Sequence, residues 1–148
     1  MVKWRMATSI LVGVDDSDTS RAAASSAAAL ADALGAELHV LTAFGKFEAE
    51  RYSVGGDEYL VSNHDDAIAT AELIAQGVRP IFPDLSVQVL AADGKPAEAL
   101  VRVAEEIDAS VVVVGNKRVQ GLARMLGSIA SDVAKNAPCD VFIAHTHG

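Results

Sequence analysis

Cysteine is almost absent from this chain, and its scarcity excludes several classes of protein. Cys139 is the only cysteine, so the chain can form neither an intrachain disulfide nor a cysteine-rich zinc site. Its position after Pro138 and before an apolar run is typical of a buried core side chain rather than a nucleophile. This cysteine usage fits a reducing compartment, and we expect a cytoplasmic protein.

Long hydrophobic runs are also lacking. No uninterrupted apolar stretch reaches membrane-spanning length, and Met1–Ser9 lacks the apolar centre of a secretory signal. Positive charge is scarce as well, because 12 Lys and Arg stand against 20 Asp and Glu, a formal net charge of −8. We therefore expect a soluble, unexported protein that binds neither membranes nor nucleic acid.

Aromatic residues make up only 5% of the chain, although 51% of its residues are hydrophobic. The core must therefore consist of alanine and branched aliphatic side chains, which suit close packing of helices on a sheet. A chain of 148 residues fits one domain, 1–148, that buries most of its apolar surface.

The sequence does contain a regular alternation of short apolar runs and segments with helical spacing. We predict strands at Ser9–Val14, Glu37–Phe44, Leu85–Ala91, Val111–Val114 and Asp140–His145. We predict helices at Thr19–Leu34, Glu58–Gln76, Pro96–Ile107 and about Gly127–Asn136, with a long polar loop at Gly45–Asp57. This alternation predicts a single-domain α/β fold: a doubly wound, five-stranded parallel sheet with helices on both faces.

Right-handed crossovers leave few strand orders, and the commonest ones place the first strand beside the fourth or beside the third. The first strand is central in either case. We expect the order 3-2-1-4-5, with the winding reversed between strands one and four, so that Asp15 lies opposite Gly115. The alternating pattern of Leu85–Ala91 predicts one edge strand, and Asp140–His145 forms the other.

The stretch from Ala109 to Ile129 carries the clearest functional signal. A strand of four valines, buried on both faces, ends at Gly115; a basic loop follows, and a helix opens at Gly127. The cations of this loop are Lys117, Arg118 and Arg124. Such a loop beside a helix N-terminus with free N–H groups favours an anion, phosphate above all. An ordinary strand-to-helix turn has the same glycines.

Several segments together resemble the universal stress protein family. They are VGVDDSDTS at the first strand, GKPAEAL after the third, VVVVGN at the fourth and LGSIASDVAKNAPCDVFIAH near the end. The resemblance spans nearly the whole chain. It implies a Rossmann-like fold of the adenine nucleotide alpha hydrolase-like type and a role in stress response or signalling. It also implies binding of ATP or another adenine nucleotide, such as AMP or cyclic AMP, with or without Mg²⁺.

The ATP-binding branch of that family has a glycine, two residues, a second glycine, nine residues, then glycine followed by serine or threonine. Gly115 matches the first glycine and Gly127-Ser128 the last pair. Arg118 stands at the second glycine, and the spacer 119–126 is one residue short. The arginine could either crowd a phosphate or contact it through two hydrogen bonds, and the sequence leaves both open.

The resemblance implies a role for each matched residue. Asp15 would lie near the ribose or adenine, Gly13 and Val14 would line the base pocket, and Ala43 would close its apolar wall. Gly115, Lys117 and Gly127 would approach the phosphates, which Ser128 and the N–H groups of Ile129 and Ala130 would bind. Val114 and Arg118 complete the predicted nucleotide site.

These residues also allow structural interpretations. Asp15 and Asp16 could be helix-capping acids, Ser128 could be only an N-cap, and Lys117 and Arg118 could be solvated surface charges. The His145-x-His147 pair would project to one face of a strand, but it lacks nearby Cys or acidic partners, so we predict no metal site.

Two other functions stay open. Arg118 and the short spacer favour a non-nucleotide branch of the same family that acts through dimerisation or a protein partner. Asp15 and Asp16 could instead hold magnesium in a phosphorylatable receiver domain, although no lysine follows His145 to complete its charge set.

Enzymatic chemistry has little support in the sequence. It has no nucleophile–base pair at a recognisable spacing and no Walker loop, so we predict a binder, with only slow incidental ATP hydrolysis left open. The family resemblance further implies a homodimer that pairs the edge strands Asp140–His145 of two copies.

Overall fold

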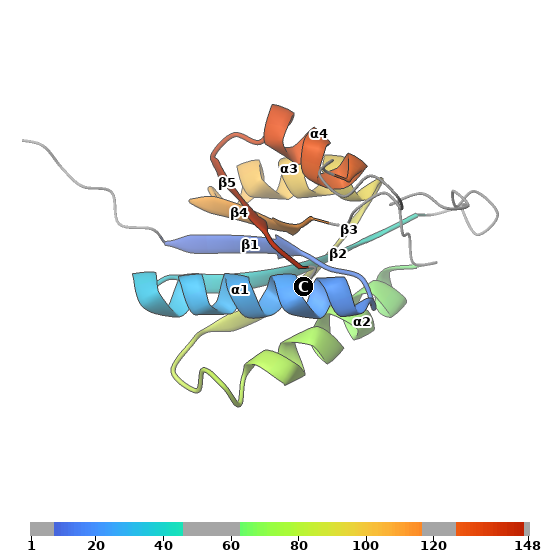
Figure 1. Cartoon of the computed structure of the whole chain (residues 1–148). Coiled ribbons are helices and arrows are strands. Elements are labelled where there is room, and N and C mark those ends of the chain that lie inside the picture. Colours follow the sequence, from blue (N-terminus) through green and yellow to red (C-terminus); the bar gives the residue numbers. More distant parts are fainter. Residues whose placement is uncertain (1–7, 46–62, 117–126, 147–148) are drawn as a thin grey trace, which may run out of the picture.

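The computed structural model describes residues 8–45, 63–116 and 127–146, in which five strands alternate with four helices (Figure 1). The strands are β1 (Ser9–Gly13), β2 (Glu37–Phe44), β3 (Val87–Asp93), β4 (Val111–Gly115) and β5 (Asp140–Ala144). The helices are α1 (Asp18–Leu34), α2 (His64–Val78), α3 (Pro96–Glu106) and α4 (Ser128–Asn136). No described helix combines the length and the apolar character needed to cross a membrane.

All strand pairs are parallel, and the strand order is β3-β2-β1-β4-β5. The predicted doubly wound fold and its strand order are therefore confirmed. Helices α1 and α2 cover one face of the sheet, and α3 and α4 cover the other (Figure 1). The central β1 lies between β2 and β4, so their carboxyl ends meet where the winding of the chain reverses.

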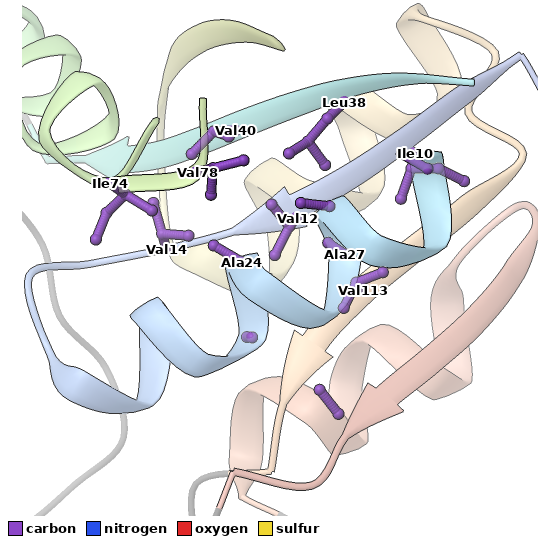
Figure 2. Close-up of a cluster of buried hydrophobic side chains, with 14 of the residues drawn as sticks. Ile10, Val12, Val14, Ala24, Ala27, Leu38, Val40, Ile74, Val78 and Val113 are labelled. Atoms are coloured by element: carbon purple, nitrogen blue, oxygen red, sulfur yellow. The ribbon is translucent and has the colours of Figure 1, made fainter. Parts of the chain in front are cut away.

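Helix α1 packs on the sheet through alanine methyl groups. Its buried alanines, none more than 1% exposed, are Ala23, Ala24, Ala27, Ala28 and Ala31. They share a core cluster with Ile10 and Val12 of β1 and Val113 of β4 (Figure 2). Methyl groups are the smallest side chains that still bury apolar surface, so such a helix face allows close packing on the strands.

The second cluster lies between the sheet and the helices α3 and α4. Val112 and Val114 belong to it, whereas Val113 belongs to the first cluster. Residues of β4 are thus buried on both faces, as the unbroken valine run predicted. Leu100 of α3 and Val133 of α4 pack against the strands from this side.

Some predicted element boundaries were wrong. Helix α2 continues through Gly77 to Val78 instead of ending at Gln76, because Val78 is only 3% exposed and packs in the core. The described part of α2 begins after Asn63, whose Oδ1 accepts the N–H of Asp66 at 2.9 Å. The predicted helical residues 58–62 and the predicted loop from residue 46 onward lie outside the described residues.

Strand β3 starts and ends two residues later than predicted. Its register continues to the pair of Phe44 with Asp93, and the N–H of Gly94 donates to the Phe44 carbonyl at 2.8 Å. Strand β5 ends at Ala144, one residue before the predicted His145. Pairing with the neighbouring strand, rather than local hydropathy, sets these limits.

Candidate functional site

A pocket opens at the carboxyl ends of β1 and β4. Its volume, including the open solvent at its mouth, is about 690 Å³. The ends of β1, β2 and β4 line it, together with the N-terminal turns of α1, α3 and α4. Ligands in doubly wound sheets bind at such a reversal of winding.

Nine predicted site residues come together in this pocket. They are Gly13, Val14, Asp15, Ala43, Val114, Gly115, Gly127, Ile129 and Ala130. Ser128 is exposed as the first residue of α4 and is not among the residues that line the pocket. Lys117 and Arg118 lie outside the described residues.

The inner part of the pocket is apolar. Leu41 and Ala43 of β2 are 1% and 8% exposed, and Leu100 of α3 closes the floor beside Gly13. A Cβ atom at Gly13 would lie 2.7 Å from Leu100 Cδ1, so only glycine fits without displacing the leucine. Sequence reasoning missed Leu100 in the site, because its helical spacing indicates only a core position.

Of the three helices whose first turns line the pocket, α4 has the N-terminus best suited to bind an anion. The Ser17 side chain already caps α1, and α3 begins with Pro96, which has no N–H to donate. Helix α4 follows Gly127, with no side-chain cap hydrogen bond and no acidic residue in its first turn. Gly127, Ile129 and Ala130 line the pocket, so the first turn of α4 brings the positive end of the helix dipole to it.

Asp15 is held by a local hydrogen-bond network. Its Oδ1 accepts from the N–H of Ser17 at 2.8 Å and from the hydroxyl of Ser20 at 2.9 Å. The Ser20 Oγ also accepts the N–H of Asp15 at 2.7 Å. Ser17, not Asp15, is the N-cap of α1, so the carboxylate supports the cap while it lines the pocket. The spacing within DSDTS could have indicated these serines.

Gly115 has a packing role of its own. A Cβ there would lie 3.1 Å from Thr19 Cγ2 and 3.3 Å from Thr146 Cγ2. Glycine is thus favoured at the end of β4 by the approach of α1 and of the segment after β5. Gly127, not Ser128, is the N-cap of α4, so Ser128 does not have the capping role that the sequence allowed.

Other candidate chemistry is limited in the part of the chain that the structure describes. It contains no group of three His, Cys, Asp or Glu residues that could hold a metal ion. His145 is exposed, and His147 lies outside the described residues. Cys139 is partly buried; burial, and then the negative charge of Asp140, raise the pKa of its thiol.

Comparisons with known proteins agree with this architecture. The sequence matches the universal stress protein family over residues 6–145. A universal stress protein of Mycobacterium tuberculosis is 31% identical over 156 residues, which cover 93% of this chain and 95% of that protein. Another from Bacillus subtilis is 29% identical over 147 residues, covering 93% of this chain and 99% of the relative.

Solved structures show the same fold. A universal stress protein crystallised in complex with cAMP has a TM-score of 0.70 and 29% sequence identity, over 97% of this chain and all of the other. The family match extends from before β1 to beyond β5 and so includes every strand of the sheet. This chain belongs to the universal stress protein family.

Proposed function

We propose that this protein binds an adenine nucleotide in the pocket between β1 and β4 and acts in stress response or signalling. ATP is the first candidate ligand, and AMP and cyclic AMP are the others. The proposal rests on one observation: the pocket joins an apolar slot to a helix N-terminus without a side-chain cap. A related universal stress protein binds cAMP, which supports this ligand class.

The two ends of the pocket match the two ends of a nucleotide. The base would enter the apolar slot between Ala43 and Leu100, and the phosphates would lie at the first turn of α4. Asp15 belongs to the nucleoside side, because a carboxylate repels phosphate but accepts hydrogen bonds from hydroxyl and amino groups. Lys117 and Arg118 stay predicted phosphate contacts.

The proposed role is that of a binder rather than an enzyme. Mg²⁺ would enter with the nucleotide, held mainly by phosphate oxygens, because the described residues offer no ready three-ligand metal site. Release of inorganic phosphate from bound ATP, followed over hours, measures any incidental hydrolysis.

The test is a calorimetric titration of purified protein with ATP, AMP and cyclic AMP. Gly127→Leu places a bulky side chain at a buried position of the pocket and should weaken binding at least tenfold. Gly77→Leu is the matched control, because Gly77 is exposed and a Cβ atom placed there meets nothing within 4 Å. If no nucleotide binds the wild-type protein at submillimolar concentration, the proposal is wrong.

We further propose a homodimer in which the β5 edges of two copies pair. The same dimer would also be needed for the alternative function, in which the protein acts through dimerisation or a protein partner and binds no nucleotide. Phe142 of β5 is 43% exposed although it lies in an apolar edge strand, and edge strands of this kind are usually covered. A second copy would provide that cover through backbone hydrogen bonds and apolar contact.

Sedimentation at micromolar concentration tests the dimer. Phe142→Lys should shift the protein to monomer, whereas Leu73→Lys, on the exposed side of α2, should not. A wild-type protein that sediments only as monomer contradicts the dimer. Native protein that carries no nucleotide but retains a partner in pull-down would favour the alternative function.

A further inference from the structure

The side chain of Ser20 contacts both the backbone and the carboxylate of one residue. Ser20 lies in the first turn of α1, is 8% exposed and lines the pocket. Its hydroxyl donates to Asp15 Oδ1 at 2.9 Å, while its Oγ accepts the N–H of Asp15 at 2.7 Å. Helix formation does not require this serine, since alanine has the higher helix propensity.

These bonds determine which oxygen of Asp15 is left for a ligand. Oδ1 is held from two sides, by the Ser20 hydroxyl and by the N–H of Ser17 at 2.8 Å. Two donors on one oxygen hold it in place and so restrict the side-chain torsions of Asp15, χ1 included. No described residue donates to Oδ2, and Asp15, partly buried, lines the pocket.

An ionised carboxylate can only accept hydrogen bonds. A ligand group that binds the Asp15 carboxylate must therefore be a hydrogen-bond donor. A phosphate, which is also negatively charged, would be repelled. In a nucleotide, the available donors are the sugar hydroxyls and the exocyclic amine of the base. Both belong to the nucleoside part and not to the phosphate chain.

We propose that Ser20 is a positioning residue, which orients Asp15 so that Oδ2 accepts a hydrogen bond from the nucleoside part of the ligand. This inference rests on the proposed nucleotide function and assigns one step of its recognition. Ser20 contributes to nucleoside affinity through Asp15 and leaves the phosphate interactions unchanged.

A double-mutant cycle with Ser20→Ala and Asp15→Asn tests the coupling. Each single variant should bind ATP about tenfold more weakly, as expected for loss of a charge-assisted hydrogen bond. The double variant should bind no more weakly than Asp15→Asn alone. Ser20→Thr keeps the hydroxyl and should restore most of the affinity, and Ser25→Ala, at an exposed serine of the same helix, should change nothing.

Two probes separate the parts of the ligand. Inorganic triphosphate should bind wild-type protein and Ser20→Ala equally. ATP analogues that lack both sugar hydroxyls, or that lack the exocyclic amine, identify the donor. The analogue that binds wild-type protein and Ser20→Ala with equal affinity lacks the group that Asp15 binds. Additive losses in the cycle, or an equal loss for triphosphate, would overturn the inference.

A measurement without nucleotide keeps this inference separate from the proposed function. Three-bond NMR couplings should report a single χ1 rotamer for Asp15 in the wild-type protein and averaging in Ser20→Ala. Retention of the single rotamer in Ser20→Ala refutes the positioning role. Failure of the wild-type protein to bind any nucleotide refutes the proposed function, while the couplings still decide what Ser20 does.

Discussion

At the scale of single residues, Gly13 packs closely against Leu100 at the floor of the pocket. A Cβ at residue 13 would lie 2.7 Å from Leu100 Cδ1, and Leu100 is 3% exposed and has little room to move. We expect Gly13→Ala to lower the free energy of unfolding by about 1–3 kcal/mol, the usual cost of overpacking. Chemical denaturation measures this loss. In a Leu100→Ala background, Gly13→Ala should leave the free energy of unfolding almost unchanged, because the clashing side chain is gone. An equal loss of stability in both backgrounds would contradict this explanation.

Cys139 provides a second residue-level prediction. Burial raises the pKa of its thiol, so the folded protein holds less thiolate than an unfolded chain at the same pH. Iodoacetamide should therefore alkylate the native protein more slowly than the urea-unfolded protein at pH 8. Because burial disfavours the thiolate in the folded state, ionisation of Cys139 leaves stability unchanged below the unfolded thiol pKa of about 8.5 and lowers it as pH rises from there through the folded pKa. Equal alkylation rates of the native and unfolded protein would show that the thiol is not protected. Cys139→Ala, which has no thiol, is the control for the pH dependence of the free energy of unfolding.

Residue roles were also the hardest to predict from sequence. The acid after strand one and the glycines after strand four could be placed near one another, because parallel strands end at the same edge of a sheet. The bonds from Ser20 to Asp15 and the approach of Leu100 to Gly13 depend on distances of a few ångströms. The hydropathy pattern of a sequence does not predict distances between individual side chains. Gly115 illustrates the limit: a glycine in the sequence indicates a close approach, but not whether the neighbour is a ligand or, as with Thr19 Cγ2 at 3.1 Å from a Cβ placed there, a side chain.

At the scale of elements, a particular side chain caps the start of α1 and the start of the described part of α2. Asn63 Oδ1 accepts the N–H of Asp66 at 2.9 Å and so caps the described helix α2. We expect Asn63→Ala to destabilise the protein by about 1 kcal/mol, because one first-turn N–H loses its partner. Asn63→Asp, which keeps an acceptor oxygen beside the helix N-terminus, should retain most of the stability. Thermal unfolding of the two variants distinguishes them, and equal destabilisation would exclude a capping role.

Element types were predictable where one pattern dominated. The four valines of β4 predicted a buried strand, and Gly35 predicted the end of α1, where it has the left-handed φ of 68°. Element ends were less predictable at β3 and α2. Pairing with β2 determines where β3 begins and ends, and burial of Val78 in the core extends α2 to that residue. Both are interactions between residues that lie far apart in the sequence.

At the scale of the whole molecule, the pocket connects elements that lie far apart in the sequence. It is lined by the ends of β1, β2 and β4 and by the first turns of α1, α3 and α4. A bound nucleotide should therefore stabilise the domain as a unit. At ATP concentrations of 100 times Kd we expect a gain of about 2.7 kcal/mol and a rise in Tm of about 5–10 °C. Calorimetry at the same ATP concentration should show this rise for Gly77→Leu and at most about half of it for Gly127→Leu, whose binding is at least tenfold weaker. A nucleotide-independent Tm in the wild-type protein would contradict the prediction.

The alanine face of α1 has a consequence for tuning this protein. Ala23 lines the pocket, while Ala27 and Ala31 of the same helix are buried in the core beneath it. Because these methyl groups separate the helix from the sheet, a larger side chain at Ala27 or Ala31 should push α1 away from the strands and displace Ala23 at the pocket. A substitution that contacts no ligand atom should therefore still alter the shape of the pocket.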